Sequence, residues 1–370
     1  MCPALSLIKL CAGSPGWRCA GGRSVQRWGR RQFNLLALAA GWGVTSAHST
    51  VSDLPKVRLG LSLRGSMTHF PLVLADQMGY FKALGIQIEW CEFESETQVQ
   101  QALTAGLVDV VSGPFEQVFD LNEHGQKIKA FVLQSRTPQI SLGIAMRRLA
   151  AFQNLSDLKR FKIGISDWGS SSHAMAVLWG LQAGLNPRDM TLLPVGAMNT
   201  AIDHLRGGAV DALCHMDPLM SWLEYKSEVR VVAETRSLQG TQLWMGGPSA
   251  ATCLFAKAEF IQLKSELIQG LTDGVVRALK WLMTAGPSDL LKSVPAHAWE
   301  GDRAFYLGTV DKLRESYCPD GQFAPEWLQT AWRSRALRLG LNRPLVVDRA
   351  ALQAAYTNES VYKSKKRFAV

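Results

Sequence analysis

A turn rich in glycine and serine, Gly169–Ser172, is the part of the chain best suited to binding chemistry. It follows the alternating run Lys162–Ser166, which predicts a short buried strand, and precedes His173–Leu181, whose apolar spacing predicts a helix. A strand, a serine-rich turn and a helix in this order point the free N–H groups and positive dipole end of the helix at whatever lies above the turn. Such an arrangement binds anions. Serine is also a favoured helix cap, so the turn on its own fits simple capping equally well.

The same pattern occurs twice in the chain. Residues 58–69 read RLGLSLRGSMTH and residues 162–173 read KIGISDWGSSSH, and the two align without a gap. Further on, LTAGLVD (103–109) and LRGGAVD (205–211) both fit L-x-x-G-x-V-D, and each precedes a proline, Pro114 or Pro218. A repeat about a hundred residues long predicts two similar lobes and not a solenoid of short repeats. Each lobe would then offer one helix N-terminus to a ligand in the cleft between them.

The elements that position these turns follow from alternating strand and helix patterns. The first lobe is predicted to contain strands Lys56–Ser62, Ile86–Glu92, Val108–Val111 and Ile128–Gln134, with helices Phe70–Leu84, Glu96–Ala105 and Glu116–Glu123. The second is predicted to contain strands Lys162–Ser166, Thr191–Pro194, Val210–Cys214 and Val229–Ala233, with helices His173–Leu181, Thr200–Arg206 and one including Met220–Tyr225. This alternation predicts an α/β fold whose mostly parallel sheets bind ligands outside the carboxyl ends of their strands.

Two segments are expected to cross between the lobes. Ile140–Met146 is interpreted as the first crossover, and Gly246–Pro248 with the apolar run Ala250–Ala256 as the return. The helices that follow are predicted to complete the first lobe: Phe260–Ala285, Arg303–Arg314 and Pro325–Arg338.

The composition is that of a soluble globular protein, with 370 residues, 47% hydrophobic and 19% charged. The net charge of +9 is concentrated at the chain ends. Residues 1–47 hold six basic residues and no acidic one, and removing these six charges leaves +3, while residues 363–367 contribute four more basic residues. Because the body of the protein is near neutral, a nucleic-acid partner is not expected.

Residues 1–47 have the features of an export signal. Arg30–Arg31 is a twin-arginine pair, followed by the modestly apolar Leu35–Val44 and the small residues Thr45–Ala47. The apolar run is too short to span a bilayer. The pattern resembles Tat signals, although Asn34 replaces the favoured leucine, and it predicts export to the periplasm by the Tat route. An arginine-rich leader without this role is the alternative.

The cysteines show no metal or redox pattern. Four of the seven follow the leader, at widely and irregularly spaced positions: Cys91, Cys214, Cys253 and Cys318. This spacing matches no zinc or CxxC motif, so no metal and no cofactor are predicted. Buried thiols are expected, with a disulfide in an oxidising periplasm as the alternative.

With these residues in view, residues 56–359 resemble the periplasmic substrate-binding proteins of ABC importers for sulfonates, taurine and nitrate, and the related binders of thiamine-pyrimidine precursors. The resemblance rests on GYFKALGIQIEW (79–90), QALTAGLVDVVSGP (101–114), the GSSSH turn and YTNE (356–359). It implies a two-lobed type II periplasmic-binding-protein fold that closes like a flytrap on one small-molecule ligand. Two extended crossovers would join the lobes, and the protein, acting as a monomer, would present its ligand to an ABC importer permease.

The resemblance also implies a division of the chain and a set of ligand-binding residues. The division is an export signal at 1–47, lobe I at 56–145 and 250–360, lobe II at 155–245, and a basic tail at 361–370. Carried over position by position, the ligand-binding residues are Ser66, Met67, Thr68, Gly113, Phe115, Gln134, Ser135, Trp168, Ser170, Ser171, Ser172, Met216 and Asp217. Hydroxyl and backbone N–H groups suit the oxygens of a sulfonate or nitrate.

Several of these side chains permit two interpretations. Trp168, Phe115 and also Trp244 suit an apolar part of the ligand, or else the core. Asp217 beside an anion is unfavourable unless the ligand also carries an ammonium group, or unless Asp217 pairs with a base such as Arg136. The histidines that end the two turns are interpreted as packing or surface residues.

An enzyme is the main rival function, because the same fold hosts a sulfinate desulfinase and thiamine-pyrimidine synthases. Desulfination of that type needs a cysteine nucleophile near the first turn, and residues 62–70 contain none. No Ser-His-Asp spacing, HExxH, Walker lysine or GxGxxG supports other chemistry, so no catalytic residue is predicted. A sensory module is a third possibility, but no signalling helix is visible. The predicted function is capture of a small anionic organic ligand, with a pyrimidine precursor or an aromatic acid as the alternative cargo.

Overall fold

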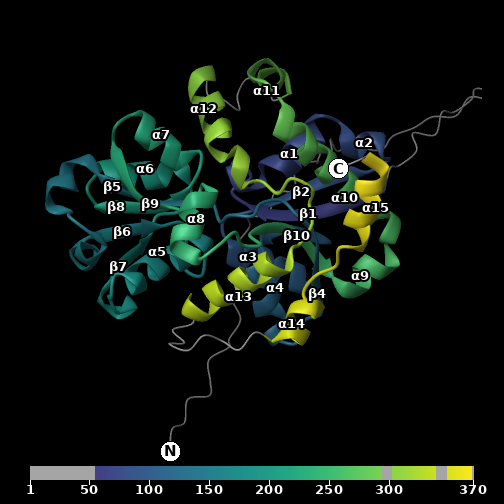
Figure 1. The fold of residues 1–370 in the computed structure, drawn as a ribbon, viewed down its shortest axis with the longest axis horizontal. Helices are drawn as coiled ribbons and strands as arrows, with labels where there is room; N and C mark the ends of the chain where they lie inside the picture. Colours follow the sequence, from purple (N-terminus) through teal and green to yellow (C-terminus); the bar gives the residue numbers. More distant parts are fainter. Residues whose placement is uncertain (1–54, 294–301, 339–347, 369–370) are drawn as a thin grey trace, which may run out of the picture.

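Two five-stranded sheets, each flanked by helices, form two lobes that lie side by side (Figure 1). The computed structural model describes residues 55–293, 302–338 and 348–368. The strand orders are β2-β1-β3-β10-β4 and β7-β6-β8-β5-β9. In each sheet the first three strands in the order are parallel, and the fourth runs antiparallel to both of its neighbours. The predicted two-lobed α/β fold with mostly parallel sheets is confirmed.

The two sheets share one arrangement of strands, and the repeated segments lie in matching strands of it. The strands of the first sheet are β1 (Lys56–Ser62), β2 (Gln87–Phe93), β3 (Val110–Pro114), β4 (Ile128–Leu133) and β10 (Thr252–Lys257). Those of the second are β5 (Ile140–Ala145), β6 (Lys162–Ile165), β7 (Thr191–Pro194), β8 (Ala212–Met216) and β9 (Val229–Glu234). The strands that carry the two serine-containing turns, β1 and β6, therefore occupy equivalent positions.

The helices of the first lobe are α1 (Phe70–Gln77), α2 (Tyr80–Ala83), α3 (Glu96–Thr104), α4 (Glu116–Glu123) and α9 to α15. The later ones span Ala258–Leu263, Ser265–Thr284, Pro287–Ser293, Arg303–Leu313, Pro325–Arg338, Arg349–Ala354 and Glu359–Phe368. The second lobe holds α5 (Ser171–Gln182), α6 (Met198–Arg206), α7 (Leu219–Tyr225) and α8 (Leu238–Met245). Among the described residues, no helix combines the length and apolar character needed to cross a membrane.

Two predicted helices are broken in the structure. The segment Phe70–Leu84 divides into α1 and α2 because Gly79 takes a left-handed φ of 71°, which a continuous helix does not permit. Phe260–Ala285 divides into α9 and α10 at Lys264, whose φ of −116° and ψ of 39° lie outside the helical region. The hydrophobic spacing continues across both breaks, so it could not reveal them.

The interpretation of Ile140–Met146 as a crossover is wrong. Residues Ile140–Ala145 form β5, which pairs antiparallel with both β8 and β9 inside the second sheet. The chain instead crosses at residues 134–139 and returns at 246–251, and these two segments are hydrogen-bonded to each other. Ser249 N donates to Arg136 O (2.9 Å), and Ala251 N donates to Ser135 O (3.2 Å). The first part of lobe I therefore ends before β5. In each lobe the antiparallel strand, β5 or β10, directly follows a crossover in the chain.

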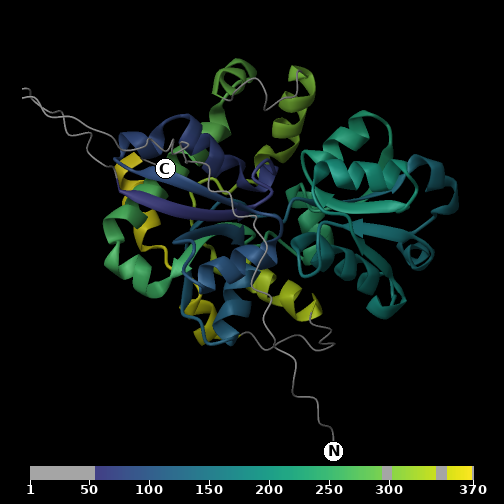
Figure 2. The same cartoon turned by 180° about the vertical axis from the view of Figure 1, so that it is seen from behind.

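The final residues do not form a separate basic tail. Helix α15 packs against α10, with the side chain of Val361 fully buried in the first lobe's core. Three of its basic residues pair with acidic ones: Lys363 with Glu359 (2.7 Å), Lys365 with Asp320 (2.5 Å), and Arg367 with Asp273. In both views the last described helix lies on the first lobe (Figures 1 and 2). The predicted export signal at 1–47 lies outside the described residues.

The lobes contact each other at several places. Helix α12 of the first lobe reaches α7 of the second, where Lys312 Nζ lies 3.0 Å from a Glu224 carboxylate oxygen and the rings of Phe305 and Trp222 meet edge to face at 5.1 Å. Helix α13 also contacts α5. The structure thus represents an arrangement in which the two lobes are already close together.

Candidate ligand-binding site

The two repeated turns make similar hydrogen bonds, in which a serine caps the following helical segment. Ser66 caps the 3₁₀ turn Met67–His69: its Oγ accepts from Thr68 N (3.2 Å) and lies 2.9 Å from Thr68 Oγ1. Ser170 caps α5: its Oγ accepts from His173 N (3.2 Å) and lies 2.9 Å from Ser172 Oγ. The hydroxyls of Ser66 and Ser170 therefore act as helix caps, which is the alternative to ligand binding that the sequence allowed. The hydroxyls that remain for a ligand are those of the neighbouring residues.

The second repeated motif is structural. In each lobe its aspartate accepts a hydrogen bond from the backbone N–H of the basic residue that begins the first repeated motif. Arg58 N donates to Asp109 (2.9 Å), and Lys162 N donates to Asp211 (3.1 Å). Arg58 adds an ion pair to Asp109 (2.5 Å). These aspartates hold neighbouring parallel strands in register. They lie near the amino ends of β1 and β6, whereas the serine turns follow the carboxyl ends.

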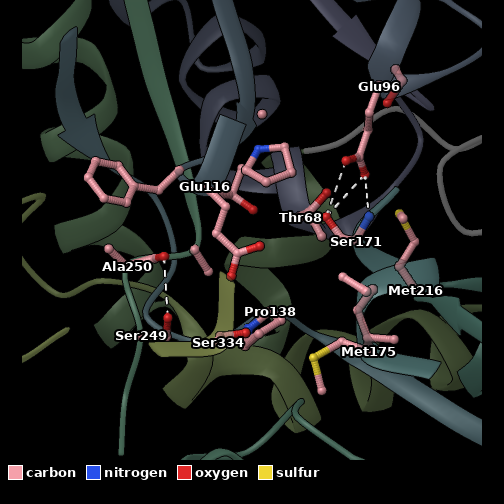
Figure 3. Close-up of a pocket in the computed structure, with 18 of the residues that line it drawn as sticks. Thr68, Glu96, Glu116, Pro138, Ser171, Met175, Met216, Ser249, Ala250 and Ser334 are labelled. Carbon is pink, nitrogen blue, oxygen red and sulfur yellow. Dashed lines mark hydrogen bonds between the residues drawn. The ribbon is translucent and has the colours of Figure 1, made fainter. Parts of the chain in front are cut away.

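Two cavities lie between the lobes, and Met216 lines both. The first, here named the Thr68 cavity, has a volume of about 50 Å³. Its lining is Ser62, Thr68, His69, Glu96, Gly113, Pro114, Phe115, Glu116, Pro138, Ile140, Ser171, Ala174, Met175, Met216, Ser249, Ala250, Ala251, Thr252 and Ser334. Many of these residues come from β1, β3, α5 and the two crossovers, and Figure 3 shows several of them around the cavity. Because small-molecule pockets usually measure roughly 300–1,000 Å³, an organic ligand can enter this cavity only if the lobes separate.

The second cavity, here named the Asp217 cavity, is larger, at about 780 Å³. It is lined by Leu63, Arg64, Gly65, Ser66, Met67, Phe70, Val73, Gln77, Glu92, Ala197, Met198, His215, Met216, Asp217, Pro218, Leu219 and Tyr306. A backbone hydrogen bond between the lobes, from Met67 N to Asp217 O (2.9 Å), joins two of its walls. This volume is within the range of small-molecule sites.

A carboxylate from the first lobe occupies the N-terminus of α5. Ser171 Oγ lies 3.2 and 3.3 Å from the two carboxylate oxygens of Glu96, and Ser171 N lies 3.4 Å from one of them. Figure 3 shows Glu96 reaching toward Ser171 across the boundary between the lobes. Gln117 Nε2 donates to the same carboxylate (3.2 Å). The serine turn of the second lobe therefore does bind an anionic group, and in this structure that group belongs to the chain itself.

The Thr68 cavity is acidic in its described lining. Glu96 and Glu116 line it, no lysine or arginine does, and Figure 3 shows Glu116 pointing in among Ala250, Pro138 and Ser334. His69 contributes no charge near neutral pH, because burial lowers its pKa to about 4. Its Nε2 must carry the proton, since its partner Ser62 O (3.0 Å) can only accept. Nδ1 then accepts from Ser112 Oγ (2.8 Å), and the ring links the ends of β1 and β3.

The structure divides the predicted ligand-binding residues into three groups. Five line the Thr68 cavity: Thr68, Gly113, Phe115, Ser171 and Met216. Four line the Asp217 cavity: Ser66, Met67, Met216 and Asp217. Five line neither cavity: Gln134, Ser135, Trp168, Ser170 and Ser172. The first turn is thus shared between the two cavities, and α5 contributes mainly through Ser171.

The residues that line neither cavity are engaged elsewhere. Ser135 Oγ donates to Thr137 O (3.1 Å) within the crossover, and Gln134 Nε2 donates to Ser112 Oγ (2.8 Å). Ser172 Oγ accepts from Ser166 N (2.9 Å) inside the turn. Trp168 is 51% exposed, with its ring edge against His173.

The structure also gives the surroundings of the remaining aromatic residues and of Asp217. Phe115 has its ring buried against Phe119 (5.0 Å) and Phe323 (5.4 Å), and Trp244 packs on Trp179 (6.3 Å). Both rings therefore pack in the core, and Phe115 also lines the Thr68 cavity. The basic residue nearest to Asp217 is Arg236 (3.8 Å) and not Arg136.

The sequence did not identify Glu96, Glu116 or the crossover residues that line the Thr68 cavity, which are Pro138 and residues 249–251. Glu96 stands in the first turn of α3 behind its cap Ser95, and Glu116 stands in the first turn of α4. An acidic residue is ordinary in the first turn of any helix, because it complements the helix dipole. No local signal distinguishes such a residue from one that faces the opposite lobe.

Three of the four described cysteines have thiols that are difficult to ionise. All four in the described part of the chain are buried, and no disulfide joins them. Burial raises the pKa of Cys214 and of Cys253 well above its ordinary value, and raises that of Cys318 to about 12. Thiols with raised pKa values are almost entirely protonated at neutral pH and react slowly.

Comparison with known proteins identifies the family. The model of the NMT1-like family matches residues 52–290, which is more than half of the chain. The chain belongs to the NMT1-like family. This membership, with the two-lobed topology, agrees with the periplasmic-binding-protein fold expected from the sequence.

The chain is also similar to individual proteins in sequence and structure. The NMT1-like chain is 32% identical to a protein of known structure from Bordetella bronchiseptica RB50, with a TM-score of 0.77, covering 85% of this chain and 98% of that one. It is 25% identical over 250 residues to a Bacillus subtilis (strain 168) protein named as a candidate aliphatic sulfonates-binding protein, covering 66% of this chain and 69% of the relative. The MOPS-bound alkanesulfonate-binding protein SsuA from Xanthomonas axonopodis pv. citri shares the fold, at 19% identity and a TM-score of 0.63, over 82% of this chain and 98% of that one.

Proposed function

We propose that this protein is a periplasmic solute-binding protein that captures a small anionic organic ligand, of the sulfonate, taurine or nitrate type, between its lobes and delivers it to an ABC importer permease. The observation that carries the proposal is the contact of Ser171 with both carboxylate oxygens of Glu96. It supports an oxyanion as the group that the α5 N-terminus accepts. The relative named for aliphatic sulfonates supports the same class of ligand.

The mechanism follows from the arrangement of the lobes. Each lobe places one turn at the boundary, with Thr68 from β1 and Ser171 from α5 lining the same cavity. The lobes are joined through residues 134–139 and 246–251, which pair with each other and can act as a hinge. When the lobes separate, Glu96 leaves Ser171 and the donors of the turn become available. A ligand that binds donors of both lobes then favours the closed form, because its affinity for that form is higher.

Release to a permease requires the reverse movement. A partner that binds both lobes in the open arrangement would lower the affinity of this protein for its ligand, and the ligand would then dissociate. The proposed export of the mature chain, through residues 1–47, would place it where such an importer collects its cargo.

An enzymatic role has less support. The described cysteines are buried, and the three discussed above have raised pKa values. None of the four cysteines lines either cavity. A desulfinase-type nucleophile is therefore not provided by the described site.

Thermal unfolding of the mature protein with a ligand panel tests the proposal. The panel contains propane-1-sulfonate, nitrate, benzoate and an aminopyrimidine, each at rising concentration. A true ligand at about one hundred times its Kd should stabilise the protein by roughly 2.7 kcal/mol. Stabilisation by a sulfonate or nitrate supports the proposal, and stabilisation only by benzoate or the aminopyrimidine replaces it with the alternative cargo.

A pair of variants localises the effect. Ser171→Ala removes the hydroxyl that faces Glu96 and should reduce the stabilisation by the ligand. Ser156→Ala removes an exposed hydroxyl bonded to Asn154 at another helix start in the same lobe and should leave it unchanged. Equal stabilisation of the two variants by the ligand would contradict a role for the α5 turn.

A further inference from the structure

Arg64 is the one lysine or arginine in the described linings of the two cavities. It lies in the first repeated turn, close after β1, and is only partly buried. The carbon of its guanidinium lies 4.1 Å from the centre of the Trp90 ring. Among the described residues this guanidinium has no hydrogen-bond or ion-pair partner, and the bond to Glu92 Oε1 (3.1 Å) comes from the Arg64 backbone N–H. A guanidinium with unused donors is suited to binding a carboxylate or a sulfonate.

The residues around Trp90 place this guanidinium beside the Asp217 cavity. Trp90 Nε1 donates to Asp76 Oδ2 (3.0 Å), which fixes the ring that Arg64 covers. Trp90 and Glu92 are two positions apart in β2, so their side chains lie on the same face of the strand. Glu92 lines the Asp217 cavity, and so does Gln77, the residue next to Asp76 in α1. The guanidinium over Trp90 is therefore held at the side of this cavity.

The acidic residues that line the same cavity are not paired with the Arg64 side chain. The Asp217 side chain is fully buried, accepts a hydrogen bond from Ser221 N (2.7 Å) and lies 3.8 Å from Arg236. Glu92 is exposed, and its bond to Arg64 is to the backbone. Arg64 thus supplies an accessible charge whose hydrogen-bonding capacity the described residues leave unused.

We propose that Arg64 is a specificity-determining residue that binds a second anionic group of the ligand, a carboxylate or a sulfonate, in the Asp217 cavity. The ligand is then an organic dianion, with one oxyanion at Ser171 and the other at Arg64. This inference rests on the proposed function. Both cavities lie between the lobes and share Met216, which places the two subsites next to each other. The volume of about 780 Å³ leaves space for the chain that joins the two groups.

The test compares ligands that differ only in a terminal methyl or carboxylate group, by titration calorimetry. One pair is propane-1-sulfonate and 3-sulfopropanoate, and a longer pair is hexane-1-sulfonate and 6-sulfohexanoate. Wild-type protein should bind the carboxylated member of at least one pair at least tenfold more tightly. Arg64→Gln keeps the backbone N–H that bonds Glu92 and removes the charge. It should abolish the preference by weakening the dianion, with far-ultraviolet circular dichroism confirming the fold.

Arg277→Gln is the matched control. The Arg277 guanidinium also lies 4.1 Å from an aromatic ring centre, that of Tyr80, but Arg277 lines neither cavity. This variant removes a stacked arginine of the same lobe and should retain the preference for the dianion.

The outcomes separate the two proposals. If the wild-type protein binds both members of each pair equally, the inference about Arg64 is wrong and the proposed function stands. An unchanged preference in Arg64→Gln also overturns the inference, since another residue then binds the carboxylate. If none of these sulfonates binds and nitrate does not bind either, the proposed function itself fails, and the inference fails with it.

Discussion

Stability should fall in mild acid because His69 is buried without a charge. Its Nε2 donates to Ser62 O and its Nδ1 accepts from Ser112, so a second proton would place a donor on the nitrogen that now accepts. Burial lowers the pKa of His69 from 6.5 to about 4. Between these values the unfolded chain binds a proton that the folded chain does not. Stability is therefore complete above pH 6.5 and is lost progressively as the pH falls toward 4.

The magnitude follows from the two pKa values. The full pKa shift lowers the free energy of unfolding by about 3 kcal/mol below pH 4. About 2 kcal/mol of this is already lost at pH 5 relative to pH 7.5. The perturbation is His69→Gln, whose amide can still donate to Ser62 O but does not titrate. This variant is expected to be less stable than the wild type at pH 7.5. Its further loss between pH 7.5 and 5.0 should be smaller than the wild-type loss by about 2 kcal/mol.

Urea unfolding at the two pH values measures this difference. His204→Gln is the control, because His204 is exposed on α6 and bonds only the Thr200 carbonyl of its own helix. Its pH dependence should match that of the wild type. If His69→Gln and the wild type lose equal stability on acidification, His69 is not the buried neutral link between β1 and β3 that the geometry describes.

Two further predictions concern the ligand and export. Glu96→Gln should tighten binding of propane-1-sulfonate by about tenfold, because it removes a competing carboxylate from Ser171, whereas Glu94→Gln in the exposed loop before α3 should leave calorimetric affinity unchanged. Weaker binding in Glu96→Gln would show that Glu96 supports the ligand. Replacing Arg30 and Arg31 by lysine should retain the precursor in the cytoplasm on cell fractionation, and undiminished periplasmic protein would contradict the Tat proposal.

Much of the fold could be predicted because its determinants are local. The alternating pattern of Lys162–Ser166 and the spacing after Ser171 specify a strand and a helix whichever lobe they belong to. The repeated turn then predicted two equivalent lobes, and the equivalent hydrogen bonds of Ser66 and Ser170 agree with that prediction.

The features that the sequence did not predict depend on contacts between residues far apart in the chain. The apolar run at Ile140–Ala145 is compatible with a crossover or a central strand, and only its partners in β8 and β9 decide between them. The contact of Glu96 with Ser171 joins residues 75 positions apart, from opposite lobes. The two cavities likewise arise from lobe packing, which divides one predicted set of ligand-binding residues between them.

The central claim is that one ligand binds donors of both lobes, and calorimetric titration of two single-hydroxyl variants tests it most directly. Thr68→Val removes a hydroxyl of the first lobe and Ser171→Ala one of the second, and both side chains line the same cavity. Hydrogen bonds to a charged group contribute about 1.5–3 kcal/mol, so each variant should bind the sulfonate or nitrate identified by thermal unfolding at least tenfold more weakly than the wild type. A loss in only one of the two variants would contradict a ligand shared between the lobes.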